Sequence, residues 1–227
     1  MTDAAIETHG LAKSYGNHAA LEPLDLRIEP GQLVMLVGPN GSGKTTFIRM
    51  AAGLLEPSDG EVLIDGFDAG SLDARAALSY LPDNPVLYDD LSLLEHLHFI
   101  GRLHGVDGEE LDERGAVLLD RFHLTERADD LPVTFSRGLR QKTSLILGLI
   151  RPFSVLVVDE PFVGLDQPGK RALIELMEDA HGQGATVVVA THSLEFVDIA
   201  ERCVGLRDGE LAYDGPATAA DVERLVS

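Results

Sequence analysis

Apolar residues along the chain fall into short runs, and five of these runs have the composition of β-strands. They lie at residues 21–28, 32–38, 61–66, 155–160 and 186–192. Segments with helical spacing lie between several of them, and this alternation predicts an α/β fold. The runs VLVVD and TVVVA, within the last two ranges, are apolar at both alternating positions. That pattern is typical of parallel strands buried on both faces, so we expect these strands at the centre of the sheet.

Two regions depart from this alternation. Near the N-terminus, residues 5–16 and 21–31 form shorter runs with polar interruptions and turn residues, which predicts an antiparallel sheet with one face in water. Residues 92–150 hold three stretches with helical spacing and no strand candidate between them, so this region is expected to be an inserted α-helical lobe.

These patterns predict a single domain over residues 1–227. Its core would combine residues 1–82 and 151–227, with a mixed, largely parallel central sheet and an N-terminal antiparallel β subdomain, and residues 83–150 would form the helical lobe. A chain of this length can bury a substantial core.

Charge and composition narrow the functional classes. The 227 residues include 18 Lys and Arg against 38 Asp and Glu, which gives a net charge of -20 at pH 7. Nucleic-acid binding needs clustered basic residues, so this balance argues against nucleic acid as a partner. No apolar stretch approaches the roughly 20 residues that cross a bilayer. The opening residues, MTDAAIETHG, lack the features of a signal peptide, and we expect a cytoplasmic chain.

The cysteine and several histidines have structural interpretations. Cys203 is the single cysteine, which excludes an internal disulfide and a metal site with several thiolates in one chain. We expect it to be buried as a small apolar residue. His96, His98 and His104 lie on one predicted helix, but at helical pitch His96 and His98 point away from each other, so a metal site there is not favoured.

The stretch GPNGSGKTT follows a predicted strand and precedes a helical stretch at residues 45–55. It carries every fixed position of a phosphate-binding loop, in which glycines let backbone N–H groups wrap phosphates at a helix N-terminus. The fixed positions are Gly38, Gly43, Lys44 and Thr45, and Pro39, Asn40, Gly41, Ser42 and Thr46 complete the stretch. We expect Lys44 to reach the outer phosphates and the Thr45 hydroxyl to bind Mg²⁺. The alternative is a glycine-rich turn without a ligand.

Two acids and a histidine follow the two most apolar strands. The run VLVVDE ends in Asp159 and Glu160, where a nucleotide-binding fold places an acid that holds Mg²⁺ and a base for the attacking water. Acids at a strand end are usually solvated turn residues, but a phosphate-binding loop in the same chain favours the catalytic interpretation. His192 follows the run TVVVA and so lies at the same carboxyl edge of the sheet. A lone histidine is mostly structural, yet this position favours a γ-phosphate contact.

In the order of these elements the chain resembles the nucleotide-binding subunits of ABC transporters, over essentially its whole length. Tyr15, in KSYG, matches the aromatic residue that stacks on adenine in that family. The signature segment, FSRGLRQK at residues 135–142, resembles the family signature. By this resemblance Ser136 and Gly138 contact the γ-phosphate of an ATP bound by a partner subunit. The sequence GLD after DEPFV matches the family's dimer-contacting loop, with Asp166 as its acid.

Two positions depart from the family pattern. Arg137 stands where many members carry glycine, and a basic residue there resembles the subunits of drug and polysaccharide exporters. In the family, YLP is followed by a glutamine that contacts Mg²⁺ or the attacking water, whereas this chain has Asp83. We expect Asp83 to approach the metal through water, because its side chain is one methylene shorter than that of glutamine. A purely mechanical role for this loop is the alternative.

The resemblance implies an ATPase with ATP and Mg²⁺ as cofactors. Two such subunits, identical or different, would enclose two ATP molecules head to tail. Glu160 would act as base, Asp159 and Thr45 would serve Mg²⁺, and His192 would steady the γ-phosphate. The subunit would drive a separate transmembrane permease, in an exporter, and so lie at the cytoplasmic face of the membrane.

Three other functions remain as alternatives. ABC-type ATPases that act in DNA repair or on ribosomes generally carry a long coiled-coil insertion or two tandem nucleotide domains, for which this chain has no room. An ATP-sensing module with little turnover is suggested by Asp83, but Glu160 and His192 argue for turnover. A phosphoryl-transfer kinase would leave the signature segment and His192 unexplained.

Overall fold

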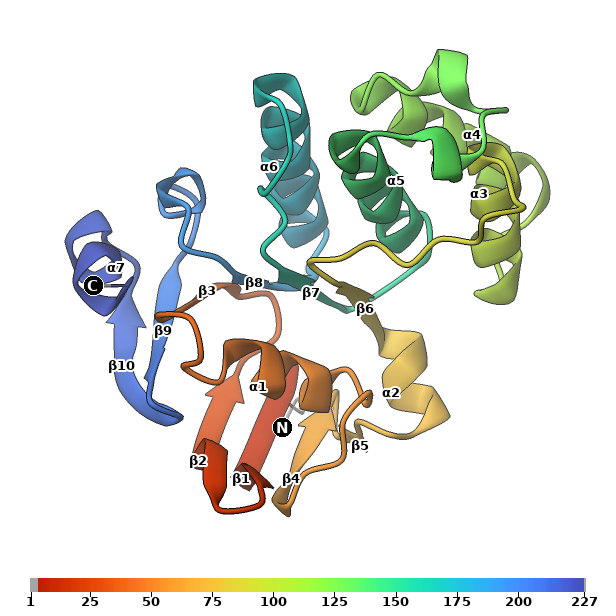
Figure 1. Cartoon of the computed structure of the whole chain (residues 1–227). Helices are drawn as coiled ribbons and strands as arrows, with labels where there is room; N and C mark the ends of the chain where they lie inside the picture. The colour runs from red at the N-terminus through yellow and green to blue at the C-terminus, as the bar shows by residue number, and fades with distance from the viewer. Residues whose placement is uncertain (1–3, 227) are drawn as a thin grey trace. The chain divides into compact units, whose positions relative to one another are not determined.

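A computed structural model describes residues 4–226 and divides the chain into two compact units, each described here by itself. The first unit comprises the chain up to Tyr80, Phe153–Glu160 and the chain from Glu178 onward, and the second comprises Leu81–Pro152 and Pro161–Met177. The helices and strands are labelled in Figure 1.

The first unit contains a six-stranded, largely parallel sheet. Its strands are β3 (Leu33–Val37), β6 (Leu78–Leu81), β7 (Val155–Asp159), β8 (Thr186–Ala190), β9 (Arg202–Arg207) and β10 (Glu210–Pro216). They are ordered β10-β9-β3-β8-β7-β6 (Figure 1). Strand β3 pairs in parallel with β8 and β9, β8 pairs in parallel with β7, and β10 is antiparallel to β9. Both β7 and β8 lie inside the sheet with every residue buried, which confirms the prediction from their uniformly apolar pattern.

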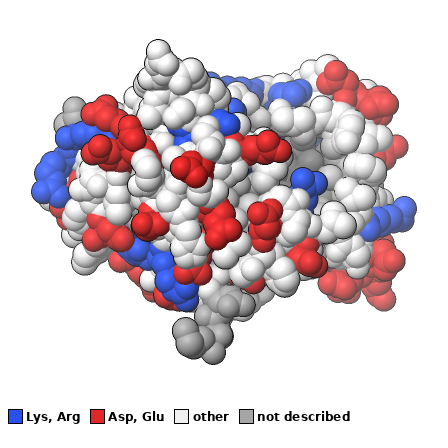
Figure 2. Space-filling model, turned by 90° about the horizontal axis from the view of Figure 1, so that it is seen from below, with Lys and Arg blue, Asp and Glu red and all other residues white. Residues whose placement is uncertain are grey.

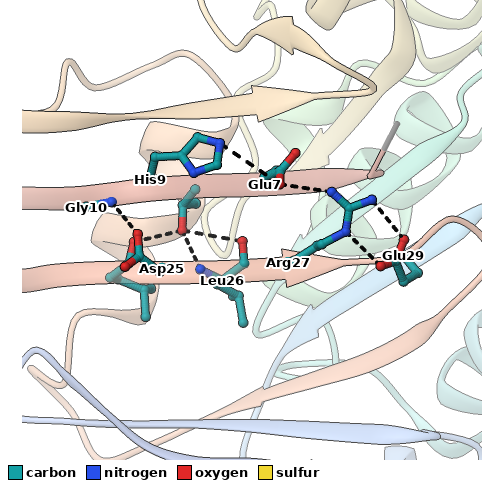
Figure 3. Close-up of polar contacts among 9 residues, drawn as sticks. Glu7, His9, Gly10, Asp25, Leu26, Arg27 and Glu29 are labelled. Carbon is teal, nitrogen blue, oxygen red and sulfur yellow. Dashed lines mark hydrogen bonds and ion pairs between the residues drawn. The ribbon is translucent and has the colours of Figure 1, made fainter. Parts of the chain in front are cut away.

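A second, antiparallel sheet forms from the N-terminal part of the chain. It consists of β1 (Ile6–Tyr15), β2 (His18–Ile28), β4 (Asp59–Ile64) and β5 (Phe67–Asp68), in the order β2-β1-β4-β5. Charged side chains on one face form a cross-strand network (Figure 3), in which Arg27 of β2 donates to Glu7 of β1 at 2.9 Å and to Glu29 at 2.7 Å. The neighbouring residues Ile6 and Thr8 are buried. The sheet therefore has one solvent-exposed face, as the sequence predicts.

One hydrophobic core joins the elements of the first unit. Helix α1 (Lys44–Ala51) contributes Phe47 and Ile48, which are buried in the same cluster as Leu26 of β2, Leu36 of β3 and Val157 of β7. The remaining helical elements of this unit are α2 (Leu72–Ala77), η3 (Leu194–Phe196) and α7 (Ala219–Val226). Because α1 is anchored in this core by its apolar face, the loop that precedes it has a fixed end point.

The second unit is helical. Its elements are α3 (Leu93–Leu103), α4 (Gly108–Arg121), η1 (Thr125–Arg127), η2 (Pro132–Thr134) and α5 (Arg137–Leu149). Helices α3 and α4 approach closely, since a Cβ atom on Gly101 would overlap the Leu111 side chain. The absence of a strand between α3 and α5 confirms the predicted helical lobe. Helix α6 (Gln167–Gly182) begins in this unit and ends in the first.

His96 fastens the loop before α3 to that helix. Its ring is buried, with Nδ1 donating to the Ser92 carbonyl oxygen at 2.8 Å and Nε2 accepting from the Tyr88 N–H at 2.9 Å. The Tyr88 ring also packs edge-on against Phe99, at 5.6 Å between centroids. His98 instead contacts Asp112 of α4 at 3.0 Å. Both histidines therefore have structural partners.

The surface carries the acidic excess of the composition. Figure 2 shows Asp and Glu side chains spread over the face in view, with basic side chains in smaller separate groups. Within residues 4–226, no helix is both long enough and apolar enough to span a membrane. Cys203 is buried in β9, as predicted.

Candidate active site

Three neighbouring parallel strands of the first unit end at the same edge of the sheet. Ala190, the last residue of β8, is paired with Leu36 of β3 on one side and with Asp159 of β7 on the other. The residues that follow these three strands therefore emerge side by side, as parallel topology requires. They are the phosphate-binding loop, Glu160 and the segment that contains His192.

The phosphate-binding loop between β3 and α1 depends on glycine at two close approaches. A Cβ atom on Gly38 would overlap the backbone oxygen of Leu206, and one on Gly43 would lie 2.8 Å from the Ala20 oxygen. Gly43 also has φ of 102°, in the left-handed region that only glycine adopts freely. The turn between β9 and β10 supports the loop as well, since the Gly209 N–H donates to the Ser42 carbonyl oxygen at 3.2 Å.

The loop presents polar groups suited to an anion. Helix α1 begins without a side-chain cap and without an acidic residue in its first turn, so its N–H groups and positive dipole end suit an anion. The Ser42 hydroxyl is buried and has no hydrogen-bond partner in the described part of the chain. A phosphate group at this position would satisfy these donors.

Lys44 folds back over the same loop. Its Nζ donates to the carbonyl oxygens of Gly38 at 2.7 Å and Pro39 at 3.2 Å. Partial burial lowers the pKa of Lys44 below its ordinary value, and the carboxylates of Glu160 and Asp159 partly oppose that shift. The ammonium group is thus held next to the phosphate-binding loop by contacts that a phosphate oxygen could replace.

A hydroxyl and a carboxylate meet beside the loop. The Thr45 Oγ1 donates to the Asp159 Oδ2 at 3.0 Å, and Asp159 is buried at the end of β7. These are hard oxygen ligands, few in number, and Mg²⁺ commonly binds to one or two protein oxygens while substrate phosphates and water complete its coordination. The two side chains therefore fit a magnesium site.

Glu160 and His192 form the second pair at this edge. The His192 Nδ1 lies 3.1 Å from the Glu160 Oε1. Glu160 has φ of 46°, which is uncommon for a residue other than glycine, and its N–H donates to the Ala190 carbonyl oxygen at 2.8 Å. This backbone bond holds the residue at the sheet edge, from which its carboxylate can accept a proton from a water molecule in the site.

Tyr15 lies at the end of β1 with its ring exposed. Its side chain is accessible, and the Lys13 Nζ sits 5.5 Å from the ring centroid. A cation at this distance is attracted to the ring face. Because the ring is exposed, it offers a flat apolar surface of the kind on which a nucleobase can stack.

The signature segment opens α5 in the second unit. Ser136 is the N-cap of the helix, and its hydroxyl accepts from the Leu139 N–H at 3.4 Å. Gly138 packs against the next loop so closely that a Cβ atom there would lie 2.6 Å from the Gly164 carbonyl oxygen. Arg137 is exposed beside them. A helix N-terminus with free N–H groups can bind an anion.

Asp166 and Asp83 also belong to the second unit. Asp166 forms an ion pair with Lys142 at 2.9 Å, and this contact, more than its bond from the Gly169 N–H, lowers the pKa of the Asp166 carboxyl. Asp83 accepts from the Asn84 side-chain amide at 2.8 Å.

Some features of the site were not anticipated from the sequence. The pairing of Lys142 with Asp166 joins residues that are 24 positions apart, and the support of the phosphate-binding loop by Gly209 spans a still longer stretch. Neither contact has a local sequence signal, because both depend on how loops meet in the folded chain.

The geometry of the first unit defines a class of protein. A phosphate-binding loop between β3 and α1, a Thr45–Asp159 pair and a Glu160–His192 pair at one sheet edge make a nucleotide-binding ATPase of the phosphate-loop type.

Comparison with known proteins narrows this class to a family. Residues 21–163 match the family described as ABC transporter. The chain is also 37% identical over 210 residues to the SkfA peptide export ATP-binding protein SkfE of Bacillus subtilis (strain 168), covering 92% of this chain and 88% of the relative. The chain therefore belongs to the ABC transporter family, as an ATP-binding subunit with ATPase activity.

Solved structures agree with this assignment. The chain is similar to the ATP-binding subunit of an ABC transporter, with a TM-score of 0.88 and 30% identity over 97% of this chain and 92% of that chain. It is also similar to the dimeric post-hydrolysis state of the ATP-binding cassette MJ0796 bound to ADP and Pi, with a TM-score of 0.85 and 26% identity. That similarity covers 94% of this chain and 99% of the cassette.

Proposed function

We propose that two copies of this subunit, or this subunit and a related one, enclose two ATP molecules head to tail and hydrolyse them. Each ATP is held by Lys44 and Thr45 of one subunit and by Ser136 and Gly138 of the other. Support comes from the similarity to a dimeric cassette and from the N-termini of helices α1 and α5, whose N–H groups and dipoles suit phosphate oxygens.

Contacts within the first unit support the roles proposed for the metal-binding and catalytic residues. Asp159 and Thr45 hold Mg²⁺, which when bound supplies charge neutralisation for the phosphates. Glu160 accepts the proton of the attacking water, and His192, at 3.1 Å from Glu160, contacts the γ-phosphate. The backbone of residues 38–46 wraps the phosphates, and Tyr15 stacks on adenine. Asp166 contacts the partner subunit.

The pairing of Glu160 with His192 carries this proposal most directly. An acid after β7 could be an ordinary solvated turn residue. Its left-handed backbone, its bond to Ala190 and its contact with His192 instead fix the carboxylate at the edge where the phosphate-binding loop lies. A fixed carboxylate within reach of a water molecule is the arrangement of a general base.

The proposed reaction powers transport by a separate transmembrane permease. The chain of SkfE, which is similar over most of both lengths, is named for peptide export, and this supports an exporter. The subunit would then lie at the cytoplasmic face of the membrane. We propose that the helical lobe, residues 83–150, transmits the motion and that residues 1–82 and 151–227 form the nucleotide-binding core.

Phosphate release by the purified chain and by Glu160→Gln tests this function. The glutamine keeps the size of the side chain but cannot accept the proton, so kcat should fall by roughly 100-fold or more, the contribution of a positioned general base. Binding of a fluorescent ATP analogue should stay within about twofold of the wild type, because the phosphate-binding loop is unchanged.

A matched control is Glu61→Gln, which removes an exposed carboxylate on β4 and should leave kcat unchanged. Wild-type turnover in Glu160→Gln would remove Glu160 from the role of base. An inactive wild-type chain that still bound ATP would instead support the sensing alternative.

A further inference from the structure

Among residues 4–226, one acidic side chain lies at an ion-pair distance from a buried lysine on α5, the signature helix, which begins within the signature segment. The side chain of Lys142, on α5, is 9% exposed, whereas that of Asp166 is 58% exposed. The Lys142 Nζ lies 2.9 Å from the Asp166 Oδ1 and 3.1 Å from the Oδ2. Lysine is almost never buried unless its charge is paired. The ion pair therefore ties the inner side of α5 to an exposed carboxylate on the dimer-contacting loop, residues 164–166.

The start of α6 is shaped around this pair. The Asp166 Oδ1 also accepts from the Gly169 N–H at 3.0 Å. A Cβ atom on Gly169 would lie 2.7 Å from the Asp166 Oδ1 and 2.9 Å from the Lys142 Cε. Glycine at this position thus leaves room for the lysine stem, and the Asp166 carboxylate is fixed from two sides.

A second contact fastens the same loop to the same helix. Gly138 lies four residues before Lys142 and so on the same face of α5. Its backbone is in close contact with the Gly164 carbonyl oxygen, since a Cβ atom on Gly138 would approach that oxygen to 2.6 Å. The dimer-contacting loop is held at both ends, by Gly138 at residue 164 and by Lys142 at residue 166.

We propose that Lys142 is a positioning residue that locks the dimer-contacting loop to the signature helix. The two segments then meet the partner subunit as one rigid surface, with Ser136, Gly138 and Asp166 in fixed register. An ion pair with one exposed partner adds little net stability, because water screens its attraction, but its directional contacts fix geometry. This inference rests on the proposed head-to-tail dimer.

Steady-state hydrolysis by Lys142→Met tests the positioning role. Methionine fills the space of the lysine stem without its charge, so the Asp166 carboxylate keeps only its bond from the Gly169 N–H. We expect kcat to fall on the order of tenfold to a hundredfold, because a displacement of about 1 Å in a positioned group can cost ~100-fold. Binding of ATP to the separate subunit should stay within about twofold, because the phosphate-binding loop is in the other unit.

A double-mutant cycle separates positioning from general destabilisation. If Lys142 acts through Asp166, the double variant Lys142→Met with Asp166→Asn should be no slower than the slower single variant. Lys142→Arg, which keeps the charge, should recover at least half of the lost kcat. The exposed Arg171 of α6 gives the control, since Arg171→Met removes a nearby cation that does not touch Asp166 and should keep the wild-type rate.

The outcomes distinguish this inference from the proposed function. Independent, multiplicative losses in the two single variants would overturn the positioning role, and so would a wild-type kcat in Lys142→Met. If Lys142→Met does not fold, Asp166→Asn and Lys142→Arg still decide, because the inference requires the first to lose activity and the second to retain it. A wild-type chain that neither hydrolyses ATP nor dimerises would refute the proposed function itself.

Discussion

Glu160 and His192 are 32 residues apart in the sequence and 3.1 Å apart in the structure. Their proximity follows from the parallel pairing of β7 with β8, in which Asp159 is level with Ala190. The sequence predicts this much, because uniformly apolar runs are typical of parallel strands, and parallel strands of one sheet end at the same edge. It cannot predict the left-handed backbone of Glu160, which depends on the loop that follows.

Asp83 stands where the family has a glutamine. We propose that the Asp83 carboxylate approaches Mg²⁺ through water in the assembled site. Asp83→Gln should then raise the Mg²⁺ concentration for half-maximal hydrolysis about fivefold, which corresponds to the ~1 kcal/mol of one charge pair at about 4 Å in water. The measurement is the ATPase rate as a function of Mg²⁺ concentration.

The control for Asp83 is Asp89→Asn, which removes an exposed charge from the same loop and should leave the Mg²⁺ dependence unchanged. An unaltered Mg²⁺ dependence in Asp83→Gln would mean that the loop has only a mechanical role.

The reactivity of the buried Cys203 thiol depends on pH. Burial raises the pKa of its thiol to about 11, so at pH 8.5 fewer than about 1 in 100 folded chains carry the reactive thiolate, against about half of unfolded chains. Reaction with a chromogenic disulfide reagent should therefore be at least ~100-fold slower in the folded protein than in urea. Equal rates would show that Cys203 is accessible.

The raised pKa of Cys203 also makes the folded state less stable as the pH rises. The unfolded thiol ionises at lower pH than the folded one, so the Cys203 contribution is fully present below about pH 8.5 and is lost as the pH rises toward 11. The Cys203→Ala variant should lack this part of the alkaline loss of stability, measured by urea unfolding across that range.

At the scale of elements, α3 begins with a complete capping box. The Ser92 hydroxyl accepts from the Glu95 N–H at 3.2 Å, and the Glu95 carboxylate accepts from the Ser92 N–H at 2.7 Å. The latter bond lowers the pKa of Glu95. The contribution of this bond is thus present above the ordinary glutamate pKa and is lost as the pH falls through the lower folded value.

Removing this cap should destabilise the fold. Ser92→Ala is expected to lower the free energy of unfolding by about 1 kcal/mol, which corresponds to a fall in Tm of about 2–4 °C for a chain of this size. Ser92→Asp, which keeps an acceptor at the same position, should lie close to the wild type. Thermal unfolding followed by circular dichroism measures both, and an unchanged Tm in Ser92→Ala would contradict the assigned cap.

Elements differ in how well their sequences predict them. The strands β7 and β8 are uniformly apolar and buried, so the spacing and composition of their residues are enough to predict them from the sequence. Strand β6 has only four residues, and β10 has no fully buried residue. Neither was predicted, because their place in the sheet is set by pairing with neighbours. The pairing of Lys142 with Asp166 was not predicted for a similar reason, since it depends on how α5 and the loop before α6 meet in the folded chain.

For the whole molecule, the amino-acid composition argues against some classes of function but does not by itself indicate a family. The net charge of -20 argued against nucleic acid, and the order of motifs indicated the ABC transporter family, which the family match confirms. The second compact unit includes α3, α4 and α5, in the region where the sequence changes from strands with apolar runs to helices, but it also takes in residues 161–177, which the sequence prediction assigned to the core. Assembly with a second subunit is not encoded in any single motif, because each partner supplies only part of the proposed site.

We propose that ATP binding brings two subunits together and that hydrolysis then separates them. Light scattering on Glu160→Gln during size-exclusion chromatography tests it directly, because this variant should bind Mg-ATP without consuming it. We predict the mass of a single chain without nucleotide and the mass of a dimer with Mg-ATP. The added change Lys44→Ala should abolish the dimer by removing the proposed phosphate contact. A single-chain mass at saturating Mg-ATP would contradict the account.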